Sequence, residues 1–295
     1  MFTIYNKNYK KHSGNITTIN RLKNLINITE SNIITNNIIG INAYLFGKQL
    51  INSDINYIII LSGTDINVDI NDSFKFNIIQ TTLKKAKYIV SFNNYMIDII
   101  CSKFNLNTNK IKLIKQGIPK NLKSYYYNLR CRLRIPSYKK IYVQIGNLRP
   151  IKRPDYLFNY FSHSKNSVLV LIGNIYEMDY FFPDNIYHIN GLEKQGVYSC
   201  IEEADGLINT SVSEGMSSSI LEAMVLQTPV YAFKNKGNMS IIKDNYNGYL
   251  FESVKIFKFI ITLPIEKIIK KAREYVHIHH SIINEKHLYN ALIHN

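Results

Sequence analysis

The chain has 295 residues, a hydrophobic content of 46% and a net charge of +15, which together favour two globular domains with a basic surface. No apolar run reaches about 18 residues and no signal peptide is visible, so the sequence supports neither a membrane span nor secretion and predicts a cytoplasmic protein. Three widely spaced cysteines, Cys101, Cys131 and Cys200, fit reduced thiols better than a disulfide framework.

The stretch from Lys110 to Lys140 contains ten basic residues and no acidic one, a pattern that would suit the phosphates of a nucleic acid. No compact nucleic-acid motif accompanies it, and we expect no nucleic-acid partner. The other interpretations are a solvated surface, attraction to anionic substrates, or peripheral contact with an anionic membrane.

Apolar runs with strand character alternate with helix-like segments along the chain, as is typical of α/β folds with parallel sheets. The predicted strands lie at residues 38–46, 57–63, 88–92, 111–117, 141–146, 167–173, 205–211 and 229–233. Residues 121–140 interrupt this pattern. We therefore place a domain border near Pro136, with the first domain at residues 1–135.

The segment from Ser211 to Phe251 is the most informative part of the sequence. Glu214 and Glu222 stand eight residues apart around a Gly-Met-Ser-Ser-Ser run that opens an apolar helix. Free backbone N–H groups of residues 215–219 at the positive end of a helix suit a diphosphate, and the carboxylates suit hydroxyl groups. An ordinary buried helix explains the apolar spacing, but it does not explain two glutamates beside a glycine.

These residues resemble the E-x7-E motif of family 4 retaining glycosyltransferases, which is followed by LEAM and PV. Here Glu214 and Glu222 are followed by Ala223-Met224 and Thr228-Pro229-Val230. The sequence also resembles the glycosyltransferase 1 domain-containing proteins of animals. The likeness extends to HSGN at 12–15, GTD-x-N-x-D at 63–69, QGI at 116–118, GNLRPIK at 146–152 and REYV at 273–276, so it spans nearly the whole chain.

The resemblance implies an α/β fold of the GT-B type, with two Rossmann-like domains whose parallel sheets face an interdomain cleft. Residues 1–135 would form the acceptor domain, completed by a C-terminal helix at about 273–295, and residues 136–272 the donor domain. The implied reaction moves a sugar, with retention of configuration, from a nucleotide-diphosphate sugar to a glycan, lipid or protein acceptor. UDP is the expected nucleotide, and no metal or other cofactor is expected.

The resemblance also assigns roles to residues around the diphosphate. Glu214 would bind the sugar hydroxyls and Glu222 the ribose. Lys152 and Arg149, in the loop that begins at Gly146, would neutralise the leaving diphosphate. The amides expected to assist them belong to Gly215, Met216, Ser217 and Ser218. Asn147 stands where the family has an arginine, and a basic surface loop is the alternative interpretation of this segment.

Further candidates lie elsewhere in the chain. The amides of Gly14 and Asn15 would contact donor phosphate or acceptor, and Gly237 and Asn238 would lie beside the donor sugar, with a tight turn as the competing explanation. Asp65 is a candidate acceptor-side carboxylate or else a helix N-cap. Asn42 stands where many relatives carry an active-site histidine.

Two sets of residues resemble metal ligands. Asp65, Asp69 and Asp72 have the spacing of a calcium loop but lack its glycine and its bidentate glutamate. The histidines at 277, 279 and 280 lack a further ligand at usable spacing. We predict no metal site.

Two other classes of function stay open at this stage. One is a noncatalytic nucleotide-sugar-binding protein that keeps Glu222 but has lost acceptor chemistry, in line with Asn42 and Asn147. The other is a basic nucleic-acid-binding protein, whose binding would weaken steeply with salt and would not depend on Glu222.

Overall fold

The computed structural model describes residues 2–7, 9, 14–50, 54–177 and 179–294, which form two compact units. The first unit comprises Met1–Gly117, Glu214–Met216 and His280–Asn295. The second comprises Ile118–Ser213 and Ser217–His279.

The first unit is built on a parallel sheet with the strand order β2-β1-β3-β4-β5-β6. Its strands are β1 (Thr3–Tyr5), β2 (Thr29–Ser31), β3 (Ile38–Ile41), β4 (Tyr57–Ile60), β5 (Tyr88–Ser91) and β6 (Ile111–Leu113). The isoleucine-rich strands β3 and β4 are buried along their whole length, as expected for a parallel sheet covered on both faces.

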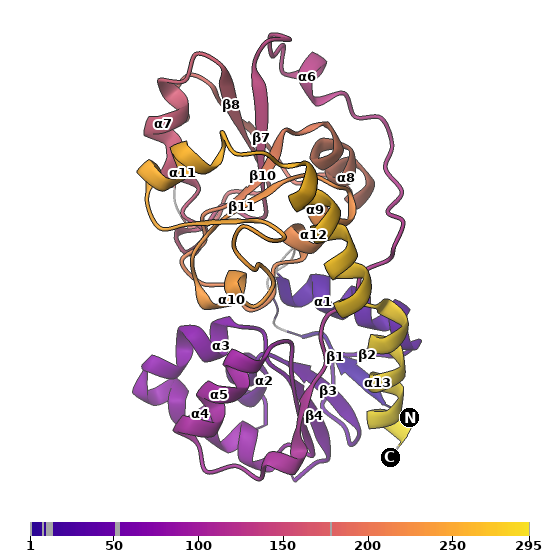
Figure 1. Cartoon of the computed structure of the whole chain (residues 1–295). Coiled ribbons are helices and arrows are strands. Elements are labelled where there is room, and N and C mark those ends of the chain that lie inside the picture. Colours follow the sequence, from indigo (N-terminus) through magenta and orange to yellow (C-terminus); the bar gives the residue numbers. More distant parts are fainter. Residues whose placement is uncertain (1, 8, 10–13, 51–53, 178, 295) are drawn as a thin grey trace. The chain divides into compact units, whose positions relative to one another are not determined.

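The helices of the first unit cover both sides of this sheet. They are α1 (Gly14–Ile26), α2 (Ala43–Gly47), α3 (Thr64–Asn67), α4 (Ser73–Lys85), α5 (Asn94–Lys103) and α13 (Ile282–His294), with short 3-10 turns η1 (Asp69–Asn71) and η2 (Thr108–Lys110). Helices α2 to α5 lie on one side of strands β1 to β4, and α13 lies on the other, where it packs on α1 (Figure 1).

The second unit has a second parallel sheet, with the order β12-β11-β10-β7-β8-β9. Its strands are β7 (Lys140–Ile145), β8 (Ser167–Ile172), β9 (Ile186–Ile189), β10 (Gly206–Asn209), β11 (Val230–Phe233) and β12 (Tyr249–Phe251). Its helices are α6 (Leu129–Arg132), α7 (Phe158–Ser162), α8 (Lys194–Glu203), α9 (Ser218–Val225), α10 (Lys236–Met239), α11 (Val254–Ile260) and α12 (Glu266–His279), with 3-10 turns η3 (Pro150–Lys152) and η4 (Pro154–Leu157).

Aromatic side chains fill one side of the second sheet. Helices α7 and α11 lie on that side, and α8, α9 and α12 lie on the other (Figure 1). The Tyr142 ring packs 5.6 Å from Phe161, 6.0 Å from Tyr231 and 6.4 Å from Phe257, measured between ring centres. These four rings join strands β7 and β11 to the helices α7 and α11, so the helices on this side pack directly on the sheet.

The order of strands in the second sheet fixes where a ligand can bind. From β7 the chain moves outward through β8 to β9, and then returns to place β10 on the other side of β7. The loops that follow β7 and β10 therefore leave the same edge of the sheet in opposite directions. Such a switch point is where ligands bind in open parallel sheets.

The border between the units differs from the predicted one near Pro136. Residues 118–135 belong to the second unit because their backbone is bonded to α8. The amides of Leu129 and Arg130 donate to the Glu203 carboxylate at 2.6 and 2.8 Å, and the Tyr127 amide donates to the Ser199 hydroxyl at 3.0 Å. In the sequence this segment only interrupts the strand pattern, because hydrogen bonds between residues so far apart in the chain leave no local pattern.

The predicted C-terminal helix at 273–295 is in fact two helices. Helix α12 ends at His279 and packs on α9 in the second unit, whereas α13 begins at Ile282 and belongs to the first. A Cβ on Gly117 would lie 2.5 Å from the Ile282 Cα, so the chain at 117 must be glycine for these segments to approach. His280 bonds the carbonyl of Gln116 through Nδ1 at 2.8 Å.

All eight predicted strands are present. The short strands β1, β2, β9 and β12 lie outside these eight ranges, because three or four residues give too little periodicity. Within the described ranges, no helix combines the length and the apolar character that crossing a membrane requires. All three cysteines are free.

Candidate functional site

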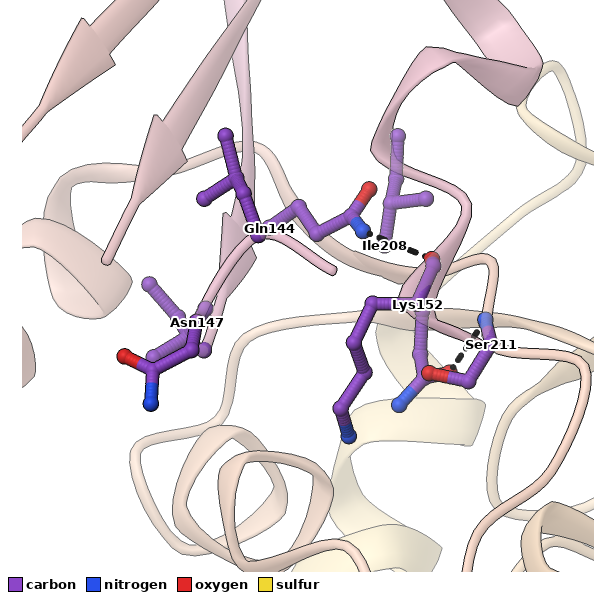
Figure 2. A pocket seen from close by; sticks show the side chains of 9 residues that line it. Gln144, Asn147, Lys152, Ile208 and Ser211 are labelled. Carbon is purple, nitrogen blue, oxygen red and sulfur yellow. Dashed lines mark hydrogen bonds between the residues drawn. The ribbon is translucent and has the colours of Figure 1, made fainter. Parts of the chain in front are cut away.

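A polar hollow lies at the switch point of the second sheet. With its solvent-open space it measures about 250 Å³. Figure 2 shows Asn147 and Lys152 from the loop after β7 beside Ile208 and Ser211 from the chain at the end of β10. The lining residues are Gln144, Ile145, Gly146, Asn147, Leu148, Lys152, Ile208, Asn209 and Ser211.

Glycines shape the entrance of the loop after β7. Gly146 has a φ of 131°, and a Cβ there would meet no atom within 4 Å, so its backbone is open to a ligand. A Cβ on Gly173, at the end of β8, would lie 2.2 Å from the Gly146 carbonyl oxygen. Both positions therefore need glycine, the first for its conformation and the second for space.

The loop that carries Lys152 is held by its backbone. The Lys152 carbonyl oxygen accepts a bond from Gln144 Nε2 at 3.2 Å and from the Thr210 hydroxyl at 2.8 Å (Figure 2 shows the former). Lys152 is among the residues that line the hollow. Asn147 is among the lining residues, whereas Arg149 is not, and the buried Arg149 Nε has no hydrogen-bond partner among the residues that the structure describes.

Arg153 was missed by sequence reasoning. It adopts the left-handed conformation, with a φ of 40°, and its guanidinium lies 4.0 Å from the Phe233 ring centre and 4.3 Å from that of Tyr156. Its Nε donates to the Thr210 carbonyl at 3.1 Å. Through these contacts Arg153 joins the loop that carries Lys152 to Phe233 at the end of β11 and to Thr210 after β10. The only sequence signal was its place next to Lys152.

The helix α9 begins later than predicted. Ser217 is its N-cap, so the amides that open the helix begin at Ser218, and those of Gly215 and Met216 precede it. The Ser217 hydroxyl accepts a bond from Asn209 Nδ2 at 3.3 Å, and Asn209 Oδ1 accepts bonds from the Ser211 amide at 3.0 Å and Asn238 Nδ2 at 3.3 Å. Asn209, which has no distinguishing pattern in the sequence, therefore connects the hollow to the start of α9.

Glu222 lies inside α9 with a side chain that is 5% exposed. It forms an ion pair with Lys194 at the start of α8, whose side chain is 52% exposed. Burial raises the pKa of Glu222, and the neighbouring Lys194 ammonium opposes that rise. Tyr198, one turn further along α8, has its pKa raised by burial and by the negative charge of Glu222.

Glu214, Gly215 and Met216 belong to the first unit. The Glu214 carbonyl oxygen accepts bonds from the Tyr95 hydroxyl at 2.6 Å and from Asn67 Nδ2 at 3.2 Å, and Asn93 Nδ2 donates to the Gly215 carbonyl at 2.6 Å. A Cβ on Gly215 would lie 2.7 Å from the Ser62 carbonyl oxygen, which explains the glycine of the motif. The glutamate side chain is buried, at 8% exposed.

The prediction for Asp65 as an acceptor-side carboxylate is corrected by its environment. The side chain is fully buried and accepts bonds from the amides of Ala43, Ser62, Gly63 and Ile66 at 2.8 to 3.1 Å. Burial raises the pKa of Asp65 to about 6, although those amides favour the ionised form. Asp65 therefore holds the turn after β4 against the start of α2 and does not face solvent.

Asn42 is also a structural residue. Its φ is 67°, its Oδ1 accepts bonds from the amides of Tyr44 and Leu45 at 3.1 and 2.8 Å, and its Nδ2 donates to the Ser62 hydroxyl at 2.8 Å. It is the N-cap of α2, a position in which asparagine is favoured both as a cap and in the left-handed region.

The remaining predicted residues are not among those that line the hollow. Gly14 and Asn15 begin α1 in the first unit, and a Cβ on Gly14 would meet no atom within 4 Å. Gly237 and Asn238 lie in the short helix α10 of the second unit. Asn238 is fully buried and donates to the Phe233 carbonyl at 2.8 Å, which fixes its side chain within the second unit.

The residues that resemble metal ligands have other partners. Asp69 pairs with Lys75 at 2.8 Å, Asp72 caps α4 through the Lys75 amide, and His279 packs on Tyr275. Among the described residues, no group of three or more histidine, cysteine, aspartate or glutamate side chains could hold a metal ion.

Two Rossmann-like parallel sheets, one with a polar hollow at its switch point, are the architecture of the GT-B fold. The crystal structure of Anabaena Alr3699/HepE in complex with UDP-glucose is similar over 99% of this chain and 98% of that one, with a TM-score of 0.80 and 14% identity. Sucrose-phosphate synthase from Thermosynechococcus elongatus is similar over 86% and 72% of the two chains, with a TM-score of 0.71 and 14% identity. At these identities the likeness shows the fold.

The family follows from the sequence comparisons. Residues 128–263 match the model of the glycosyl transferases group 1. The chain is 33% identical over 280 residues to glycosyltransferase 1 domain-containing protein 1 of Xenopus tropicalis, and the match covers 86% of this chain and 81% of that protein. The chain belongs to the glycosyl transferases group 1 family and is a glycosyltransferase.

Proposed function

We propose that this glycosyltransferase takes its sugar from a UDP-sugar and transfers it with retention of configuration. The observation that carries the proposal is the grouping of Gly146, Lys152 and Asn209 around one hollow, with Asn209 bonded to the N-cap of α9. An open glycine backbone and a lysine suit a diphosphate. The start of a helix adds a positive potential to the same region.

In this proposal the second unit binds the nucleotide. The Lys152 ammonium neutralises the negative charge that develops on the leaving diphosphate, which is the kind of preorganised stabilisation that lowers such barriers most. The buried Glu222 accepts bonds from the ribose hydroxyls. It lies on α9, the same helix whose first amides belong to Ser218 and Ser219. Glu214 is proposed for the hydroxyls of the sugar.

The choice of UDP draws support from similar proteins. Alr3699/HepE was solved with UDP-glucose, and the pneumococcal O-GlcNAc transferase GtfA, with 13% identity and a TM-score of 0.65, was solved with UDP and GlcNAc. We propose a glycan, lipid or protein as the acceptor. We also propose that transfer takes place in the cytoplasm and needs no divalent metal, which activity measured in EDTA would test.

The test combines nucleotide binding with turnover. Thermal unfolding would be followed with UDP-, GDP- and ADP-sugars, while released nucleotide is assayed in the same samples. We expect a UDP-sugar to raise the melting temperature of the wild type and of the control Glu274→Ala, an exposed position on α12, but not of Glu222→Ala. A shift without nucleotide release even with candidate acceptors would favour a binding protein. No shift with any donor would refute the proposal.

A further inference from the structure

The charged partner of Glu222 has no role in the proposed function so far. The Lys194 ammonium pairs with Glu222 Oε1 and also lies 5.6 Å from the ring centre of Tyr198, so three polar side chains from α8 and α9 meet. The glutamate is almost wholly buried, whereas half of the lysine side chain is exposed. Lys194 therefore stands at the boundary between the buried carboxylate and solvent.

The hydrogen bonding of Glu222 is incomplete. Within the described ranges, Lys194 is the residue that donates to its carboxylate, and it uses Oε1. A carboxylate has about four lone-pair sites, and buried carboxylates normally fill several of them. Oε2 thus keeps its capacity to accept bonds from a ligand, while the neighbouring ammonium supplies the compensating charge.

We propose that Lys194 makes this site specific for a ribose, by holding Glu222 as an ionised carboxylate that accepts bonds from both the 2′ and the 3′ hydroxyl. The inference rests on the proposed function. An ionised carboxylate accepts at both oxygens, whereas a neutral carboxyl must donate through one of them. The ionised form therefore matches a pair of hydroxyl donors and discriminates against a 2′-deoxyribose, which leaves one site unfilled.

Among the described residues around Glu222, Lys194 is the cation that can keep this carboxylate ionised. In the described part of the chain, the titratable groups recorded beside it are Lys194 and Tyr198, both from α8. Helix α12 packs on α9, and its buried residues are Ile268, Ala272 and Val276. Strands β10 and β11 also contact α9 and consist of mostly buried residues. Since burial raises the pKa of Glu222, loss of the lysine would raise it further.

The test measures binding of UDP and 2′-deoxy-UDP by calorimetry between pH 6 and pH 9, for the wild type, Lys194→Met and Lys194→Arg. At pH 7 we expect Lys194→Met to bind UDP about tenfold more weakly and to lose most of its preference for UDP over 2′-deoxy-UDP. Its affinity should rise with pH as Glu222 ionises, while the wild type stays nearly constant. Lys194→Arg should restore both properties, and Lys165→Met, at an exposed lysine, should match the wild type.

A double variant shows whether the lysine acts through the carboxylate. In a Glu222→Gln background, Lys194→Met should cause no further loss of UDP binding. If Lys194→Met fails to fold, Lys194→Gln, which keeps a donor without the charge, takes its place. Unchanged or tighter UDP binding by the lysine variant at all pH values would overturn the inference and leave the proposed function intact. A wild type that binds no UDP would overturn both.

Discussion

The guanidinium carbon of Arg153 lies 4.0 Å from the centre of the Phe233 ring, which joins the loop after β7 to the end of β11. The same side chain bonds the carbonyl of Thr210 after β10. Three neighbouring strands of the second sheet thus meet at one arginine. Because Lys152 directly precedes it, the position of the lysine depends on this contact.

Substitutions at Arg153 should distinguish the stabilising contact of its guanidinium with the aromatic rings from the cost of its left-handed backbone conformation. Loss of the stack and of the bond to Thr210 should make Arg153→Ala less stable by about 2 kcal/mol. Arg153→Gly loses the same contacts but relieves the left-handed backbone, so it should be about 1 kcal/mol more stable than the alanine variant. Urea unfolding followed by circular dichroism suits this chain, which has no tryptophan. Equal stability of both variants would contradict the role of the conformation.

Lys152→Ala should reduce turnover about a hundredfold, because the ammonium that stabilises the leaving diphosphate is lost. The free energy of unfolding should change by less than about 1 kcal/mol, because the bonds from Gln144 and Thr210 go to the backbone carbonyl of residue 152, which any substitution keeps. The rate of nucleotide release from the donor identified above measures the effect. Lys165→Ala is the control, and equal rates for both variants would remove Lys152 from the mechanism.

Asp65→Asn should weaken the fold of the first unit by about 2 kcal/mol, because an amide NH2 would face backbone N–H donors. The pKa of Asp65 is raised to about 6, so the folded protein binds this proton more tightly than the unfolded chain. Its contribution should therefore make the unfolding free energy fall as the pH rises from about 4 to about 6 and stay constant above that. Urea unfolding across this range should show that component in the wild type and not in the variant.

The Arg21 side chain donates to both carboxylate oxygens of Glu285 at 2.5 Å, which joins α1 to α13, and Glu285 also accepts the Gly117 amide at 2.9 Å. Arg21→Met leaves this fully buried carboxylate without its cation and should cost about 3 to 5 kcal/mol. The double variant Arg21→Met/Glu285→Gln should be more stable than Arg21→Met, because no buried charge remains. Chemical unfolding of the three proteins decides this, and a double variant that is no more stable would show that charge is not the cause.

The sequence predicted the class of fold well because buried parallel strands have a strong local signal. The runs at 57–63 and 167–173 are largely apolar, and both contain an interior strand of a parallel sheet. The family motif at Glu214 and Glu222 could also be recognised in the sequence, since core packing does not explain a glycine between two glutamates. The border of the units could not be predicted from the sequence, because bonds such as that from the Leu129 amide to Glu203 join residues far apart in the chain.

The sequence by itself therefore determined the two parallel sheets, the motif and the lysine after β7, which all depend on residues close together in the chain. Only the tertiary structure decided what those residues contact. It buried Asp65 among amides, placed Asn147 beside the hollow while Arg149 is not among its lining residues, and paired Glu222 with Lys194 from another helix. The physical reason is that burial and charge pairing depend on which segments the strand order brings together, and local patterns carry no record of that order.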